Sequence, residues 1–127
     1  MNIRQKIKFF ENEVRGYIKL HNSLDFLVDF VESESEDIIA ACSEYTTNRR
    51  ISIFYISELI NGLKNEKEVS KIAYHEALEL VFLRLRYLAE NRDIIVTKQE
   101  VDDEVHRIIR IFENIYFDKI YKNNKNK

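Results

Sequence analysis

The amino-terminal segment, residues 3–21, has the apolar spacing of an amphipathic helix. A single stripe is formed by apolar residues three or four positions apart: Ile3, Ile7, Phe10, Val14 and Ile18. This spacing places them on one face of a helix with 3.6 residues per turn. Asn22 and Ser23 then interrupt the pattern. We therefore expect a helix over residues 3–21 that turns this stripe toward a core.

Residues 25–57 change to the two-residue alternation that is typical of β-strands. Alternating runs lie at residues 26–31 and 50–55, and a small apolar run lies at residues 38–45. The polar residues 46–48 between the last two runs are predicted to form a hairpin turn. We therefore expect a small three-stranded antiparallel sheet, in which the hairpin is the better-defined part.

Two long helices are predicted to complete the domain. The first begins near Asn65 and ends at about Glu90, and the second begins at Thr97 and ends at about Tyr121. At each start a residue that can cap a helix is followed three positions later by glutamate, which is a capping-box pattern. The element order predicts an α+β fold, with an N-terminal helix, a three-stranded antiparallel sheet and two C-terminal helices packed together.

Composition favours one domain. The chain has 127 residues and is 45% hydrophobic, which is enough for one core. We expect a single domain over residues 1–121 and a flexible basic tail over residues 122–127. Cys42 is the single cysteine, so no internal disulfide can form, and a reducing cytoplasmic setting is expected.

Charge and hydropathy argue against two classes of partner. The net charge of −2 provides no overall positive field for nucleic-acid phosphates. The apolar runs are far shorter than the roughly 20 residues of a membrane-spanning helix. We therefore expect neither nucleic acid nor a membrane as partner.

One motif has chemical content. His75, Glu76 and Glu79 form an H-E-x-x-E pattern within the first predicted C-terminal helix. Four residues advance a helix by about 40° beyond a full turn, so the side chains of His75 and Glu79 project to the same side and can coordinate one metal ion. Glu76 lies on the same side, where it could act as general base on a metal-bound water. The pattern is that of the zinc-peptidase helix H-E-x-x-H with its second histidine replaced.

A catalytic zinc ion needs a third protein ligand from elsewhere in the chain. We expect His106 of the last helix, because two antiparallel helices joined by a short loop could bring it near Glu79. Glu104 and Asp103 are the alternative candidates. The simpler alternative is that the motif is only a polar stripe on an otherwise apolar helix.

Two stretches of the sequence resemble a known family. Residues 72–80, which contain the motif, and residues 104–114 are similar to minimal zincins, small metallopeptidase-like proteins of bacteriophages and prophages distantly related to SprT-like and gluzincin domains. The resemblance implies a zincin-like fold, one zinc ion, a peptidase site and an edge strand near residues 49–56 that could pair with an extended substrate. The family usually has histidine where Glu79 stands, and often an acidic ligand near the place of His106.

These observations lead to two functional hypotheses. The first is a zinc-dependent metallopeptidase-like protein in which His75, Glu79 and His106 hold zinc while Glu76 is the catalytic base for attack of water on a peptide bond. The second is a non-catalytic, phage-type binding or assembly protein whose metal site has degenerated. The partner would be a peptide substrate in the first case and a protein in the second, and the sequence leaves the oligomeric state open.

Overall fold

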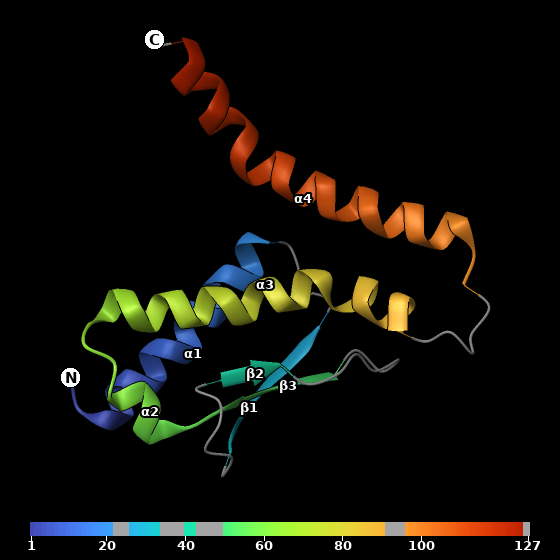
Figure 1. Cartoon of the computed structure of the whole chain (residues 1–127). Coiled ribbons are helices and arrows are strands. Elements are labelled where there is room, and N and C mark those ends of the chain that lie inside the picture. Colours follow the sequence, from blue (N-terminus) through green and yellow to red (C-terminus); the bar gives the residue numbers. More distant parts are fainter. Residues whose placement is uncertain (22–25, 34–39, 43–49, 91–95, 126–127) are drawn as a thin grey trace.

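The computed structural model describes residues 1–21, 26–33, 40–42, 50–90 and 96–125. Helices account for 74% of these residues, so the molecule is dominated by helices and its sheet is small. Figure 1 shows the elements in chain order: α1 (Ile3–Leu20), β1 (Leu27–Glu32), β2 (Ala40–Cys42), β3 (Arg50–Tyr55), α2 (Ser57–Asn61), α3 (Glu66–Glu90) and α4 (Lys98–Lys125).

The first helix matches its sequence prediction to within one residue. The Asn2 side chain accepts a hydrogen bond from the Gln5 backbone N–H at 2.9 Å, and the Gln5 side chain accepts one from the Asn2 N–H. This capping box satisfies two amide groups that the first turn leaves without helical partners. Phe10, Val14 and Ile18 of the predicted stripe are buried.

The sheet corrects the predicted fold. β1 pairs with β3 in parallel, from Leu27 opposite Arg50 to Glu32 opposite Tyr55. β2 pairs antiparallel with β3, so the strand order is β1-β3-β2 and the sheet is mixed. The expected three-stranded antiparallel sheet of a zincin-like α+β fold is therefore wrong. Side-chain alternation shows which face of a strand is buried, but it does not show in which direction the strand runs relative to its neighbour.

The sequence also predicted an edge strand near residues 49–56, and this prediction is wrong. β3 is the central strand, hydrogen-bonded to β1 on one side and to β2 on the other. Because an added peptide strand needs a free row of backbone groups, the paired segment of β3 cannot bind an extended substrate in this way.

The core lies between the sheet and two helices that cover one of its faces, α1 and α3 (Figure 1). β3 contributes Ile51 and Ile53, which are both fully buried. The ring of Phe10 from α1 packs edge-on against Phe30 at a centroid distance of 6.2 Å. From α2 and α3 the core receives Ile60, Val69, Ala73, Ala77 and Leu80.

Both long C-terminal helices begin where the sequence predicts. Oδ1 of Asn65 accepts a hydrogen bond from the Glu68 N–H at 2.9 Å, and Oγ1 of Thr97 accepts one from the Glu100 N–H at 3.1 Å. α4 continues to Lys125, through residues predicted to belong to a flexible tail.

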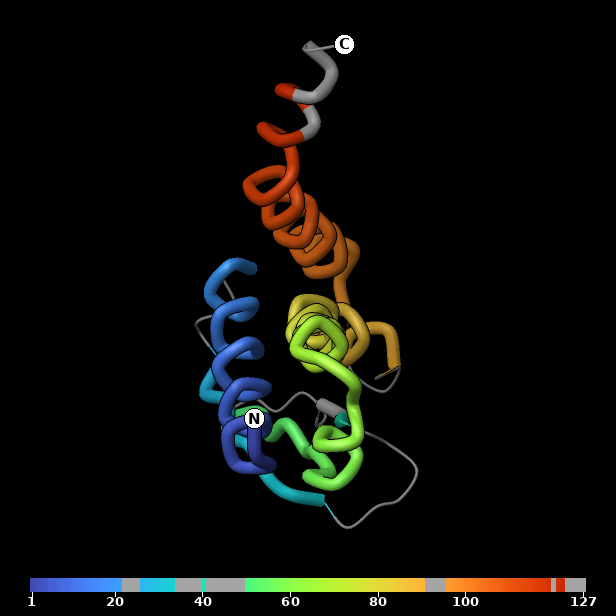
Figure 2. Tube along the Cα trace, turned by 90° about the vertical axis from the view of Figure 1, so that its left-hand side faces the viewer, coloured from blue at the N-terminus to red at the C-terminus, as the bar shows by residue number. Residues whose placement is uncertain are grey.

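α4 packs against α3 through a second, smaller cluster. Val81 of α3 is buried against Ile108 and Ile111 of α4. Further along, the hydroxyl groups of Tyr74 and Tyr116 hydrogen-bond at 2.8 Å. Beyond this contact the carboxyl-terminal part of α4 leaves the body of the molecule, as Figures 1 and 2 both show. α4 is therefore anchored over about its first two thirds, up to Tyr116, and projects over the remainder.

Candidate functional site

Two of the predicted metal ligands lie side by side on α3. Nε2 of His75 is 3.4 Å from Oε1 of Glu79, and the two side chains are 68% and 27% exposed. Oε2 of Glu79 also lies 3.7 Å from Nη1 of Arg86, so an arginine shares this carboxylate. The helix thus brings the imidazole and the carboxylate together as their spacing predicts.

Glu76, the predicted general base, is buried next to this pair. The residue is only 3% exposed, and its Oε2 has no hydrogen-bond partner among the residues that the structure describes. Burial raises the pKa of Glu76 from 4.5 to about 7; the negative charge of Glu79 adds to this and His75 offsets part of it. Such a pKa suits proton transfer near neutral pH. The burial means that this carboxyl group is held within the protein while the His75 ring faces solvent.

The three candidate third ligands each have another partner on α4. His106 is exposed, and its Nδ1 lies 2.7 Å from the backbone carbonyl oxygen of Asp102. Asp103 accepts a hydrogen bond from Gln99 at 2.7 Å. Glu104 is buried and accepts hydrogen bonds from Nε and Nη2 of Arg107.

The predicted three-ligand set is not assembled. In the part of the chain that the structure describes, no group of three or more His, Cys, Asp or Glu side chains is placed to hold a metal ion. The candidate third ligands are instead held by their own partners on α4: His106 by Asp102, Asp103 by Gln99, and Glu104 by Arg107.

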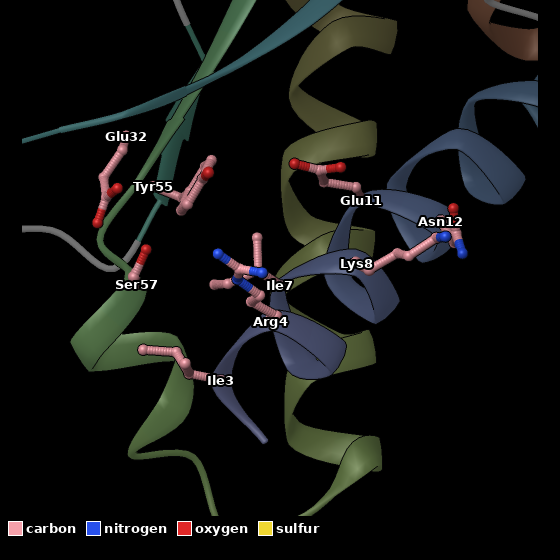
Figure 3. Close-up of a pocket in the computed structure, with 9 residues that line it drawn as sticks. All are labelled: Ile3, Arg4, Ile7, Lys8, Glu11, Asn12, Glu32, Tyr55 and Ser57. Carbon is pink, nitrogen blue, oxygen red and sulfur yellow. The ribbon is translucent and has the colours of Figure 1, made fainter. Parts of the chain in front are cut away.

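A cleft at the other end of the molecule was not predicted. It has a volume of about 530 Å³ and lies between the first turns of α1, the ends of β1 and β3, and the start of α2 (Figure 3). Arg4, Lys8, Glu11 and Glu32 line it together with Tyr55. Burial raises the pKa of Tyr55, and the charges of Glu11 and Glu32 add to this. The lining therefore carries both positive and negative charges beside the Tyr55 ring.

The most distinctive surface is on α4. Among the side chains described on α4, four large apolar ones are exposed at multiples of four residues, a set here called the α4 row: Val105 (38%), Ile109 (45%), Phe117 (59%) and Tyr121 (47%). Because four residues advance a helix by about 40° beyond a full turn, this row winds around α4 by roughly 160° from Val105 to Tyr121. Glu113 occupies the middle of the row. The rings of Phe117 and Tyr121 stack at 5.9 Å.

Further aromatic rings extend this surface toward α3. Phe112 stacks on Tyr116 at 5.8 Å, and Phe112 also contacts Phe82 of α3 at 6.3 Å. Phe82 is 39% exposed.

Phe117 and Tyr121 were not identified from the sequence. The signal was present, because these two aromatic residues fall outside the side of the last predicted helix on which Val101, Ile108, Phe112 and Ile115 lie. A helix with apolar residues on more than one side has more than one face to bury.

Comparisons of the chain with protein-family models, with curated proteins and with solved structures found no match. Among the described residues, no helix combines the length and the apolar character needed to cross a bilayer.

Proposed function

We propose that this protein is a non-catalytic binding or assembly protein, and that α4 is the element that contacts its protein partner. The observation that carries the proposal is the pair of exposed aromatic residues of the α4 row on the part of the helix that projects from the body beyond Tyr116 (Figure 2). These residues are Phe117 and Tyr121.

The physical argument rests on what exposed aromatic rings contribute. Aromatic side chains carry large apolar areas and are enriched among the residues that dominate binding energy. An amphipathic helix that presents such residues at regular spacing is a recurring way to dock on another protein. The anchored part of α4, up to Tyr116, fixes the direction of the projecting part, which reduces the ordering cost of binding.

The surroundings of the H-E-x-x-E motif support a non-catalytic role. Glu76 is buried, and Glu104 is bound by arginine. The three-ligand set that a catalytic zinc ion needs is not formed within the described residues.

Site-specific photo-cross-linking tests this proposal. Benzoylphenylalanine placed at position 117 is expected to give a defined covalent adduct in the cells from which the gene derives, because this position lies in the binding surface. The same probe at Leu20, an apolar residue of α1 that is 52% exposed, is the matched control. Equal adduct patterns at both positions, or no adduct at position 117, would contradict the proposal.

A second candidate is a zinc-dependent hydrolase centred on His75 and Glu79, favoured by the 3.4 Å separation of their side chains. The residues present supply two ligands, and zinc bound there would activate a water molecule. Zinc analysis of the untagged protein separates the candidates. A binding protein should contain far less than one zinc per chain, with stability unchanged by a chelator. About one equivalent of zinc that is lost in His75→Ala would instead support the hydrolase.

A further inference from the structure

The end of α1 carries a buried histidine that the candidate site does not use. α1 ends at His21, whose backbone N–H donates to the carbonyl oxygen of Tyr17 at 2.9 Å. The His21 side chain is completely buried, and neither ring nitrogen has a hydrogen-bond partner among the residues that the structure describes. A neutral imidazole has one N–H donor and one acceptor, so both are unsatisfied in an interior where such groups are normally paired.

This position suits the imidazole only in its neutral form. A protonated ring would have two N–H donors and a charge, and burying these without acceptors carries a large desolvation cost. The pKa of His21 is accordingly lowered from 6.5, and burial is the cause. The end of a helix favours a positive charge through the helix dipole, but burial outweighs this effect here. A proton bound to His21 therefore favours movement of the ring into water.

A series of aromatic contacts leads from His21 to α4. The ring of Tyr74 on α3 lies 5.7 Å from that of His21 and 5.1 Å from that of Tyr17, measured between centroids. The hydroxyl of Tyr74 hydrogen-bonds that of Tyr116 on α4, and this bond is the main reason that the pKa of Tyr74 is raised to about 12. Tyrosine hydroxyls are neutral in mild acid. No charged side chain among the described residues contributes to the pKa shift of His21, so nothing there compensates a charge on its ring.

We infer that His21 is a pH-sensitive latch that controls how firmly α4 is held on α3. Neutral His21 packs against Tyr74 and supports the hydrogen bond between Tyr74 and Tyr116. Protonated His21 leaves the interior, so that the end of α1 and this hydrogen bond open together. The inference rests on the proposed function in one respect, which is that α4 is the binding element whose attachment is regulated.

The latch opens on acidification. A histidine whose pKa is lower in the closed state than in the open state favours the closed state while it is neutral. Its contribution is complete above about pH 6.5 and is lost as the pH falls toward the lowered pKa of His21. Within that range the open population rises by about tenfold for each pH unit. Glu76 acts in the opposite direction, because burial raises the pKa of that carboxyl group.

NMR titration of the three histidines in the wild-type protein tests the first part of the inference without any substitution. The side chain of His75 is 68% exposed and His106 is also exposed, so both serve as internal references. The His21 ring should become protonated at a lower pH than either reference, because only its charged form is desolvated. Protonation of His21 together with the two references would overturn the inference.

Hydrogen exchange of the backbone amides of residues 104–116 tests the second part. After correction for the intrinsic pH dependence of exchange, protection in the wild type should fall between about pH 7 and about pH 5, by up to about tenfold for each pH unit. His21→Phe keeps a ring against Tyr74 but cannot bind a proton, so its protection should stay constant. His106→Gln removes an exposed histidine of α4 itself and should behave as the wild type. Because Glu76 is present in all three proteins, its opposite effect cancels in the comparison.

Constant protection in the wild type, or an equal loss in His21→Phe, would overturn the inference. Should His21→Phe fail to fold, the wild-type titration and exchange still decide. These measurements use the purified protein, whereas the cross-linking at position 117 tests binding in cells. A latch that responds to pH without an adduct at position 117 would remove the proposed function alone. An adduct combined with constant protection would remove the latch alone.

Discussion

Arg107→Met should lower the free energy of unfolding by about 3 kcal/mol, because it leaves a buried carboxylate without its main partner. The side chain of Glu104 is fully buried, and that of Arg107 is 32% exposed. Arg107 donates to Oε1 of Glu104 from Nε at 2.9 Å, and from Nη2 to the backbone carbonyl oxygen of Val81 at 2.7 Å. One guanidinium group thus joins α4 to α3.

The size of this effect follows from the asymmetry of buried ion pairs. Forming such a pair gains little, because both charges lose their hydration, but removing one partner leaves an uncompensated charge in the interior and costs about 3–5 kcal/mol. We expect the lower end of this range, since water reaches part of the Arg107 side chain. Arg84 offers limited compensation, because its Nη1 lies 3.5 Å from Oε2 of Glu104.

Urea denaturation followed by circular dichroism measures this loss. Arg110→Met is the matched control, because Arg110 is exposed on the same helix, and its effect should stay within about 0.5 kcal/mol. The double variant Glu104→Leu/Arg107→Met should recover most of the lost stability, because it removes both charges together. Equal stabilities of Arg107→Met and Arg110→Met would show that the Glu104 pair does not hold α4 in place.

Glu76→Gln should stabilise the protein at about pH 8 by about 3 kcal/mol and have little effect at about pH 4. The pKa of Glu76 is raised to about 7 from 4.5, chiefly by burial. An acid whose pKa is higher in the folded state favours folding while it is protonated. The contribution of Glu76 to the stability of the wild type is therefore most favourable below pH 4.5, falls as the pH rises from 4.5 to 7, and changes no further above this range.

This pH dependence is opposite to the one that a salt-bridged carboxylate produces. A protein stabilised by such a carboxylate loses stability as the pH falls. Glutamine resembles the protonated carboxyl group in shape and stays neutral, so the variant should lack the loss caused by Glu76. The difference in unfolding free energy between wild type and variant, measured by chemical denaturation across this pH range, isolates the effect. Glu90→Gln, at an exposed position on the same helix, is the control. A difference that does not change with pH would show that Glu76 titrates alike in the folded and unfolded chains.

Local signals predicted the helices well because their causes are local. The spacing of Phe10, Val14 and Ile18 marks the buried face of α1. Asn65 and Thr97 cap the two long helices through hydrogen bonds to residues three positions away. Caps and apolar periodicity act within one or two turns, so the sequence alone locates these boundaries.

The sheet could not be predicted to the same extent. The alternation of side chains identified β1 and β3, but the parallel pairing of Val28 with Ile51 joins residues that lie far apart in the sequence. The relative direction of the two strands depends on how the whole domain packs, including the helices α1 and α3. Neither is visible in the pattern of a single strand.

In the candidate site, too, contacts within one helix could be predicted from the sequence, whereas contacts between helices could not. The sequence determined that His75 and Glu79 would meet, because residues four apart on a helix are neighbours wherever that helix lies. Only the tertiary structure decided that α4 packs on α3 through Tyr74 and Tyr116, that Arg107 reaches the Val81 carbonyl oxygen of α3, and that Phe117 and Tyr121 remain exposed. Contacts within a helix are set by its 3.6-residue period, whereas contacts between helices depend on which faces of the whole domain are buried together.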